Sequence, residues 1–165
     1  MAGEHILIVD DEPAIRTALR GVLEDEGYRV TAVGSGADAL RVCADELPDL
    51  LFLDIWMPSL DGLDTLAELK RLRPEAMVVM ISGHGTIETA VKATRLGAYD
   101  FIEKPLSLEK TLVTVTHALE HARLERENTA LRERLEERAE IIGESAAIRS
   151  LRDQIATAAP TSGRV

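Results

Sequence analysis

The sequence predicts an α/β protein whose five strands form one doubly wound parallel sheet. Five short apolar runs alternate along the 165-residue chain with segments of helical periodicity, which is the pattern of repeated β-α-β units. The runs show little polar alternation, and strands of that kind are buried on both faces of a sheet. In such folds the ligand site lies beyond the carboxyl ends of the strands.

The strands are recognised as short runs rich in apolar and β-branched residues. They are expected at residues 5–9, 28–33, 50–53, 77–81 and 99–102. The first helix is expected to begin at Pro13 and end at Gly27, since proline favours a first helical turn and glycine follows helix ends. Ser35, with Asp38 three residues later, resembles a capping box that opens the second helix.

Apolar residues three and four positions apart define the helix faces that we expect to pack against the sheet. They are Ala37, Leu40, Ala44 and Leu47 in the second helix; Leu63, Leu66, Leu69 and Leu72 in the third, before Pro74; and Ile87, Ala90, Val91 and Thr94 in the fourth, before Gly97.

The stretch after Leu108 is β-branched enough to suggest a strand, but its periodicity is helical. Its apolar residues are spaced four, three, four and three apart: Leu108, Leu112, Val115, Leu119 and Ala122. The helical pattern continues into a charged region that reaches residue 141. We therefore expect three parts: a domain over residues 1–120, a helical linker over 121–141, and the start of another domain over 142–165.

Composition excludes several classes of function. A formal net charge of −10 is unsuited to non-specific binding of nucleic acid or anionic membranes. Cys43 is the only cysteine, so an internal disulfide and a four-thiolate zinc site are excluded. No apolar run approaches the roughly 20 residues of a membrane span, and the N-terminus lacks the features of a signal peptide. A cytoplasmic location is expected.

Polar residues follow the ends of four predicted strands. Asp10 and Asp11 come after the first strand, Asp54 after the third, Ser82 after the fourth and Lys104 after the fifth. Because the strands are parallel, these residues share one edge of the sheet. Carboxylates held close together repel one another unless a cation intervenes, and a few hard oxygen ligands suit Mg²⁺. A carboxylate beside such a cation has what a phosphoryl acceptor needs.

Each of these residues has a simpler explanation when taken alone. The acidic residues after the first strand could cap the next helix, because carboxylates favour helix N-termini. The others could be turn residues or solvated surface charges. The metal–phosphate interpretation is favoured because each group stands at the end of a different parallel strand.

Four motifs, in this order along the chain, resemble the receiver domain of two-component response regulators. They are Ile8-Val9-Asp10-Asp11-Glu12; Leu53-Asp54-Ile55-Trp56-Met57-Pro58 with Asp61-Gly62; Ser82-Gly83-His84; and Lys104-Pro105. The resemblance covers about the first 120 residues. It implies a flavodoxin-like (CheY-like) fold with Mg²⁺ as cofactor. It also implies a phospho-accepting switch that is not an enzyme, beyond catalysing its own phosphorylation and slow dephosphorylation.

The resemblance assigns the phosphoryl chemistry residue by residue. Asp54 matches the phospho-acceptor, and Lys104 matches the lysine that pairs with the phosphate. Asp11 matches the direct Mg²⁺ ligand, Asp10 the ligand that acts through water, and the backbone carbonyl of Trp56 the remaining protein ligand. The bond between Lys104 and Pro105 matches a peptide bond that is usually cis in the family.

The resemblance also assigns a switch and two residues that set its lifetime. Ser82 matches the switch hydroxyl and Phe101 the aromatic switch position, with the face over residues 86–102 expected to change on phosphorylation. In receivers, the positions of Trp56 and His84 flank the path of the hydrolytic water. Because both side chains are large, we expect them to block that water and slow dephosphorylation; the alternative for His84 is a weak general base that orients the water.

Two further segments, Gly83–Val91 and Gly97–Leu106, are similar to NtrC-family regulators, nearest the NtrX branch. Residues 142–148 and 158–161 resemble the opening of the AAA+ domain in σ54-dependent activators. The phosphate-loop pattern G-x-x-x-x-G-K-[ST] does not occur, so this sequence is expected to be part of a longer regulator. The implied partners are a sensor histidine kinase and a second copy of the chain. The full-length regulator adds the AAA+ ATPase domain, σ54 RNA polymerase and DNA, with no nucleic-acid or membrane contact by this fragment.

The charged linker carries a pattern typical of a parallel two-stranded coiled coil. With Leu124 and Leu131 at d positions, the a positions hold His121, Asn128 and Leu135, and one asparagine at a fixes register at a cost in stability. The alternative is a single solvated helix, which like-charge pairs four residues apart disfavour. The pattern covers about two heptads, and we expect dimerisation through it.

Two other functions compete with the phosphorylation switch. A phosphatase of the haloacid-dehalogenase type also places a nucleophilic Asp after a strand, but it needs a second Asp two residues later. That position is Trp56, which cannot transfer a proton. A receiver-like module that dimerises without phosphate usually lacks an acidic or lysine position, and here all are present.

Overall fold

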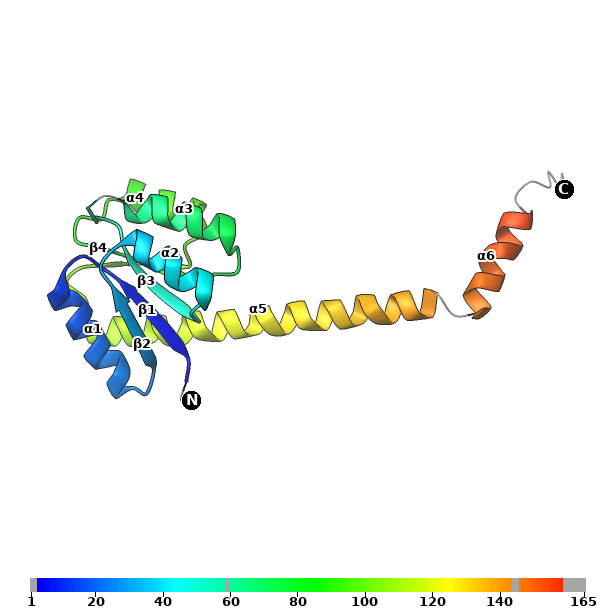
Figure 1. Ribbon diagram of the computed structural model, residues 1–165, viewed down its shortest axis with the longest axis horizontal. Helices are drawn as coiled ribbons and strands as arrows, with labels where there is room; N and C mark the ends of the chain where they lie inside the picture. Colours follow the sequence, from blue (N-terminus) through cyan, green and yellow to red (C-terminus); the bar gives the residue numbers. More distant parts are fainter. Residues whose placement is uncertain (1–2, 59, 144–145, 159–165) are drawn as a thin grey trace. The chain divides into compact units, whose positions relative to one another are not determined.

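The computed structural model describes residues 3–58, 60–143 and 146–158. Five parallel strands form one sheet in the order β2-β1-β3-β4-β5, which is the doubly wound order predicted by the alternation of strands and helices (Figure 1). The strands are β1 (His5–Val9), β2 (Arg29–Val33), β3 (Leu50–Asp54), β4 (Val78–Ser82) and β5 (Asp100–Glu103). The predicted fold class is confirmed.

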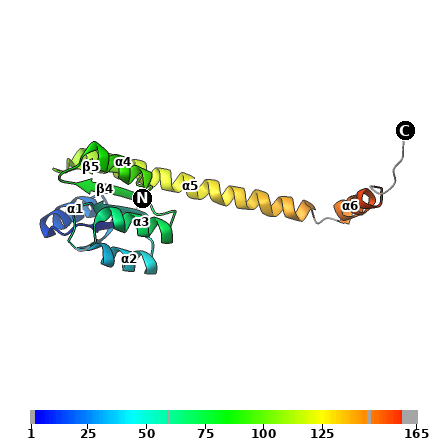
Figure 2. The ribbon, with the colours of Figure 1, turned by 90° about the horizontal axis from the view of Figure 1, so that it is seen from above.

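Helices cover both faces of the sheet (Figures 1 and 2). They are α1 (Pro13–Asp25), α2 (Gly36–Asp45), α3 (Gly62–Leu72), α4 (Ile87–Arg95), α5 (Leu108–Gly143) and α6 (Ala146–Ala158). Residues of α2, α3 and α4 pack on one face of the sheet, and residues of α1 and the first turns of α5 pack on the other.

The alternation of side chains along each strand divides the core into two parts. In β1, Leu7 and Val9 join the core beneath α2, α3 and α4, whereas Ile6 and Ile8 join the core beneath α1 and α5. All four side chains are fully buried. Because both faces are covered, the strands are apolar at successive positions, as the sequence predicts.

Helix starts are set by short polar side chains. Ser35 Oγ accepts a hydrogen bond from the Asp38 amide at 3.2 Å, which confirms the N-cap of α2. Asp61 caps α3 by accepting from the Leu63 amide at 2.6 Å. Thr86 caps α4 by accepting from the Thr89 amide at 3.1 Å. These caps fix where the chain turns from the functional edge of the sheet into each helix.

The predicted buried faces of α2 and α4 are wrong in part. For the second helix the predicted Leu40 and Leu47 pack against the core, but Ala37 and Ala44 are exposed, and the buried side chains of α2 are Ala39 and Cys43. The four predicted residues of α4 include Ile87, which is 86% exposed. Alanine spacing gave a false face in α2, because alanine is small enough for either side of a helix. In α4 the residue that reaches the core is Ala93.

The chain divides into two compact units, Met1–Ala122 and Arg123–Val165. In the first unit Val115, Ala118 and Ala122 of α5 pack against the sheet. In the second unit the predicted linker leucines are all more than half exposed: Leu124, Leu131 and Leu135. Within the described ranges, none of the helices has the length and apolarity to cross a membrane.

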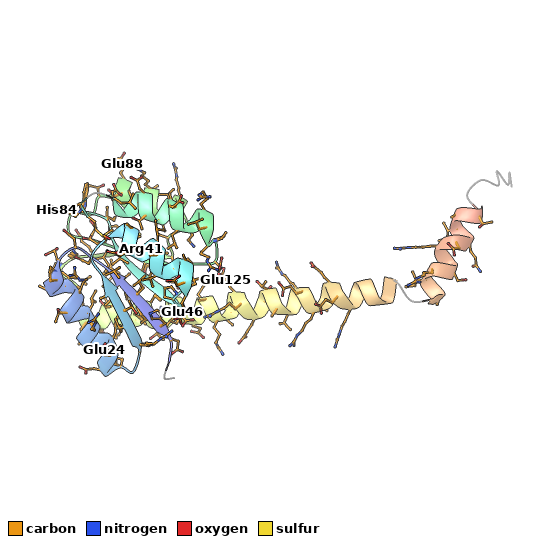
Figure 3. The ribbon with its side chains drawn as sticks, in the orientation of Figure 1. Glu24, Arg41, Glu46, His84, Glu88 and Glu125 are labelled. Carbon is orange, nitrogen blue, oxygen red and sulfur yellow. The ribbon has the colours of Figure 1, made fainter. Side chains whose placement is uncertain are left out.

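A polar network ties together the edge of the sheet opposite the carboxyl ends of the strands. The His5 ring is 5% exposed, and its Nε2 lies 2.8 Å from the Thr31 hydroxyl. Its backbone N–H donates to an Asp49 carboxylate oxygen at 2.9 Å. Arg29 pairs with Glu46, whose Oε1 lies 4.0 Å from His5 Nδ1. Figure 3 shows Glu46 at this end of the domain and His84 at the other.

Burial and the neighbouring Arg29 charge lower the pKa of His5, against the opposing effects of Glu46 and Asp49. The unfolded chain therefore binds the proton at a higher pH than the folded chain does. The stability that His5 contributes is complete above its ordinary pKa of 6.5 and is lost as pH falls below that value.

We predict that His5→Gln weakens this pH dependence, because glutamine keeps a polar group near Thr31 without titrating. Free energies of unfolding measured in urea at several pH values should fall less steeply below pH 6.5 in the variant than in the wild type. His117→Gln, at an exposed position of α5, serves as control and should follow the wild type. Parallel curves for His5→Gln and the wild type would contradict the assignment.

Candidate functional site

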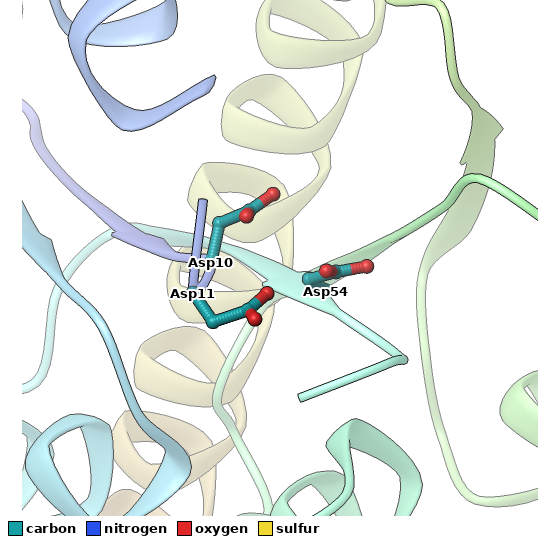
Figure 4. Close-up of side chains that lie close together, drawn as sticks. All are labelled: Asp10, Asp11 and Asp54. Carbon is teal, nitrogen blue, oxygen red and sulfur yellow. The ribbon is translucent and has the colours of Figure 1, made fainter. Parts of the chain in front are cut away.

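Three carboxylates converge at the carboxyl ends of β1 and β3 (Figure 4). Asp10 and Asp11 follow β1, and Asp54 is the last residue of β3. One oxygen from each lies within 4.8 Å of the others, as expected for groups that share a cation. Asp10 and Asp54 are buried, and Asp11 is half-buried.

The backbone of Asp10 is held from several sides. Its N–H donates to the Val33 carbonyl of β2 at 3.2 Å, and its carbonyl accepts from Arg16 Nη1 at 2.6 Å. Its Oδ1 accepts from the Glu12 amide at 2.8 Å. The carboxylate of Asp10 is therefore positioned by the turn into α1 and by the first turn of that helix.

Lys104 brings the counter-charge from the other side of the site. Its Nζ lies 2.9 Å from Asp10 Oδ2, 3.1 Å from Glu12 Oε1 and 3.3 Å from Asp54 Oδ2. The Lys104 amide donates to the Ser82 carbonyl at 2.8 Å, which fixes the chain leaving β5 beside the end of β4. The Lys104–Pro105 peptide bond is cis.

The charges in the site change the proton affinities of its members. Burial raises the pKa of Asp54, repulsion from Asp10 raises it further, and Lys104 lowers it in part. Burial acts to lower the pKa of Lys104, but its contacts with Asp10 and Glu12 and its attraction to Asp54 outweigh burial, so that pKa is raised. The Lys104 ammonium is thus firmly charged, but this single positive charge does not neutralise all the carboxylates around it.

The residues present fit a small divalent cation. Asp54 Oδ1 is buried and, among the described residues, finds no hydrogen-bond partner. A buried carboxylate oxygen without a partner is costly unless a cation or another donor satisfies it. Three carboxylates with little other protein coordination suit Mg²⁺, which keeps several of its waters.

Gly62 lets the third strand and the third helix approach closely behind Asp54. A Cβ on Gly62 would lie 2.0 Å from the Asp54 carbonyl oxygen and 2.7 Å from Ile55 Cα. The Gly62 amide donates to the Ile55 carbonyl at 2.8 Å. The position of the Asp54 backbone therefore depends on a residue without a side chain.

Ser82 and Phe101 lie on the neighbouring strands β4 and β5. Ser82 is fully buried, and its Oγ accepts from the His84 amide at 3.2 Å. The half-buried ring of Phe101 lies against Gly85, where a Cβ would come within 2.6 Å of Phe101 Cζ. The loop after β4 thus touches both residues of the predicted switch, one by a hydrogen bond and the other by van der Waals contact.

The two predicted lifetime residues are on the surface. Trp56, two residues after Asp54, is 58% exposed. His84 is exposed in the loop after β4, at the same end of the sheet (Figure 3). Both side chains are therefore accessible to solvent, whereas the Asp54 carboxylate is buried.

Sequence reasoning missed several residues that shape the site. It grouped Glu12 with the two aspartates, but nothing in the pattern shows that its side chain would reach Lys104, 92 positions away. It gave no role to Arg16, which lies on the face of α1 next to the Asp10 carbonyl. Gly85 carries no sequence signal of its contact with Phe101.

Comparison with known proteins agrees with the fold. The family model of the response regulator receiver domain matches residues 6–116. The chain belongs to this family: it contains a receiver domain of the two-component response regulator class. Within that class its receiver is of the NtrC-family type, similar to that of NtrX regulators.

Particular relatives support this placement. The nitrogen assimilation regulatory protein NtrX of Azorhizobium caulinodans is 47% identical over 97% of this chain, and the match covers 36% of that protein. A crystal structure of NtrX from Brucella abortus in complex with ADP is 46% identical, with a TM-score of 0.75, over 99% of this chain and 36% of that one.

A solution structure of the beryllofluoride-activated NtrC4 receiver domain dimer is 39% identical, with a TM-score of 0.69, over 72% of this chain and 98% of that one. The chain therefore matches receiver domains over nearly their full length. It spans about a third of the length of the curated relatives it matches.

We predict that Gly62→Ala lowers the free energy of unfolding by about 2–3 kcal/mol, because the new Cβ must push apart backbone atoms of β3 and α3. The measurement is urea unfolding. Gly21→Ala is the matched control: no described atom lies within 4 Å of its Cβ position, in the interior of α1. That substitution should be stabilising by about 0.5 kcal/mol. Equal effects of the two substitutions would refute the close approach.

Proposed function

We propose that this chain is the phospho-accepting switch of a response regulator, with Asp54 as the acceptor. The observation that carries the proposal is the convergence of Asp54 with Asp10, Asp11 and the Lys104 ammonium at one edge of the sheet. The phosphoryl donor is a sensor histidine kinase. An Asp54 oxygen attacks phosphorus, the acyl phosphate bond forms, and the bond from phosphorus to the kinase histidine breaks.

Mg²⁺ is the cofactor that the acidic cluster fits. Asp11 and Asp54 would hold it directly, Asp10 through water, and the Trp56 backbone carbonyl would complete the protein ligands. When bound, the ion neutralises charge on the phosphoryl oxygens. Lys104 supplies a second positive charge beside Asp54, so the chain's own contribution is one ammonium, together with the carboxylates that would hold the metal ion.

Phosphate on Asp54 switches the domain through Ser82 and Phe101. The Ser82 hydroxyl now accepts from the His84 amide, and a phosphoryl oxygen gives it an acceptor to which it can donate. Movement of Ser82 carries the loop after β4 with it, and Gly85 in that loop is in contact with the Phe101 ring. The face over residues 86–102 then changes because phosphate stabilises one of two arrangements.

The output of the switch is a change in dimerisation through the helical linker. Leu124, Leu131 and Leu135 are exposed in the single chain, and Asn128 lies between them on the same helix. Pairing with a second copy would bury this stripe, and the asparagine would set a parallel register. In the longer regulator the dimer would control a σ54-dependent activating ATPase, which contacts RNA polymerase and DNA, in the cytoplasm.

Two alternatives are less well supported. The receiver family and fold argue against a haloacid-dehalogenase-type phosphatase, as does Trp56 in the position of its general acid. A module that dimerises without regulation by phosphate would not need a buried, unpartnered Asp54 oxygen beside a lysine. That oxygen, described above, favours the phosphorylation switch.

We predict that incubation with acetyl phosphate and Mg²⁺ adds one phosphoryl group to the chain, on Asp54. Intact-mass spectrometry should show the increment in the wild type and none in Asp54→Ala. EDTA should abolish it, because the carboxylate cluster then lacks the cation. An increment that persists in Asp54→Ala, or that forms equally well in EDTA, would refute the proposal.

We predict that Ser82→Ala accepts phosphate but switches poorly, since alanine cannot donate to the phosphoryl group. Backbone amide shifts over residues 86–102, recorded with Mg²⁺ and beryllofluoride, should change less than in the wild type. Asp54→Ala, treated in the same way, gives the baseline. The full wild-type change in Ser82→Ala would show that the hydroxyl does not couple the site to this face.

We predict that Trp56→Asn and His84→Ala each accelerate loss of the phosphoryl group, by opening the path of the hydrolytic water. Decay of the phosphorylated mass after removal of acetyl phosphate is the measurement. Unchanged decay in both variants would contradict blocking. Slower decay in His84→Ala would instead identify His84 as a general base that orients the water.

A further inference from the structure

The side chain of Glu12 contacts Lys104 and does not cap the helix that it precedes. Glu12 is the N-cap residue of α1, where a side-chain oxygen normally accepts from helix amides. Among the described residues its side chain makes no such cap, and its Oε1 instead lies 3.1 Å from Lys104 Nζ. The Glu12 carboxylate therefore pairs with a lysine that follows β5, the last strand in the sheet order.

Lys104 is shared among three carboxylates, and Glu12 differs from the other two. Asp10 and Asp54 belong to the cluster that fits a divalent cation, whereas Glu12 does not. A cation on the cluster would offset the charges of Asp10 and Asp54 and weaken their hold on the lysine. Glu12 would then be the remaining anion competing for the Lys104 ammonium.

We propose that Glu12 is a positioning residue that holds Lys104 in the resting site and competes with the incoming phosphoryl group for it. This inference rests on the proposed function, in which Lys104 pairs with phosphate. In the resting site Glu12 keeps the ammonium beside Asp54. On phosphorylation the Nζ–Oε1 contact is exchanged for a contact with a phosphoryl oxygen. Glu12 thereby lowers the affinity of the site for phosphate-like anions.

The size of the effect follows from the exposure of the pair. The Glu12 side chain is 60% exposed and that of Lys104 is 13% exposed, so solvent screens much of their attraction. Exposed pairs of this kind change equilibria by about two- to fivefold. Loss of the Glu12 carboxylate should therefore tighten anion binding by about that factor.

The test is a beryllofluoride titration at saturating Mg²⁺, followed by the emission of Trp56. Trp56 is the only tryptophan, and it lies two residues from Asp54. Glu12→Gln removes the charge and keeps the side-chain length, and it should bind beryllofluoride about two to five times more tightly than the wild type. A Mg²⁺ titration without beryllofluoride should show no such gain.

Two variants separate the contact from the general effect of charge. Glu12→Asp keeps the charge, but its shorter side chain withdraws from Lys104 and suits the vacant N-cap. It should reproduce most of the gain. Glu103→Gln removes a charge from the exposed neighbour of Lys104 on β5 and should behave as the wild type. Urea unfolding of all variants checks that the gain does not follow changes in stability.

The outcomes are distinct. Wild-type affinity in Glu12→Gln, or a gain in Glu12→Gln that Glu12→Asp lacks, would overturn the role of the contact. An equal gain in Glu103→Gln would do the same, since it would show a long-range effect of charge. If beryllofluoride binds the wild type and Asp54→Ala alike, the proposed function itself fails, and this inference fails with it.

Discussion

The shared ion pair of Lys104 is the interaction on which this domain's functional edge depends. Asp10 and Asp54 are buried almost completely, and two buried carboxylates a few ångströms apart are costly without a counter-charge. Lys104 is the ammonium that contacts both of them. The single Lys104 ammonium does not fully neutralise these buried carboxylates. A second cation, bound from solvent, can supply the missing positive charge.

The polar groups around His5, at one edge of the sheet, have different partners from those around Asp54, at the other. At one edge Thr31 and Asp49 supply hydrogen-bond partners to His5, and Arg29 pairs with Glu46, but His5 Nδ1 is buried without a hydrogen-bond partner among the described residues. At the other edge Asp54 keeps a buried oxygen that no described residue satisfies. A protein tolerates such a group where binding supplies the missing partner. The two edges differ in charge: the unpaired His5 atom at the first belongs to an imidazole, and the unpaired Asp54 atom at the second to a carboxylate beside another buried carboxylate.

The sequence predicted the strands and the convergence of the acidic residues well, because both follow from period and topology. A strand buried on both faces is a continuous apolar run, and residues that end parallel strands must share an edge. The sequence did not predict contacts that depend on how far a side chain extends or how it is oriented. The contact from Glu12 to Lys104 spans 92 positions, and the seat of the Phe101 ring on Gly85 depends on a ring orientation. Neither has a local signature.

The exposure of α4, which the sequence did not predict, bears on how the proposed switch would work. Among the nine residues of this helix, all of them described, Ala93 alone is buried, and Ile87 and Val91 face solvent. A helix that buries so little apolar area is weakly held to the sheet, so few interactions must break for it to move. Its N-terminal loop contains Gly85, which contacts Phe101. In the proposed switch, a phosphoryl group at Asp54 would therefore need only modest differential binding to shift α4, because few buried contacts hold that helix to the sheet.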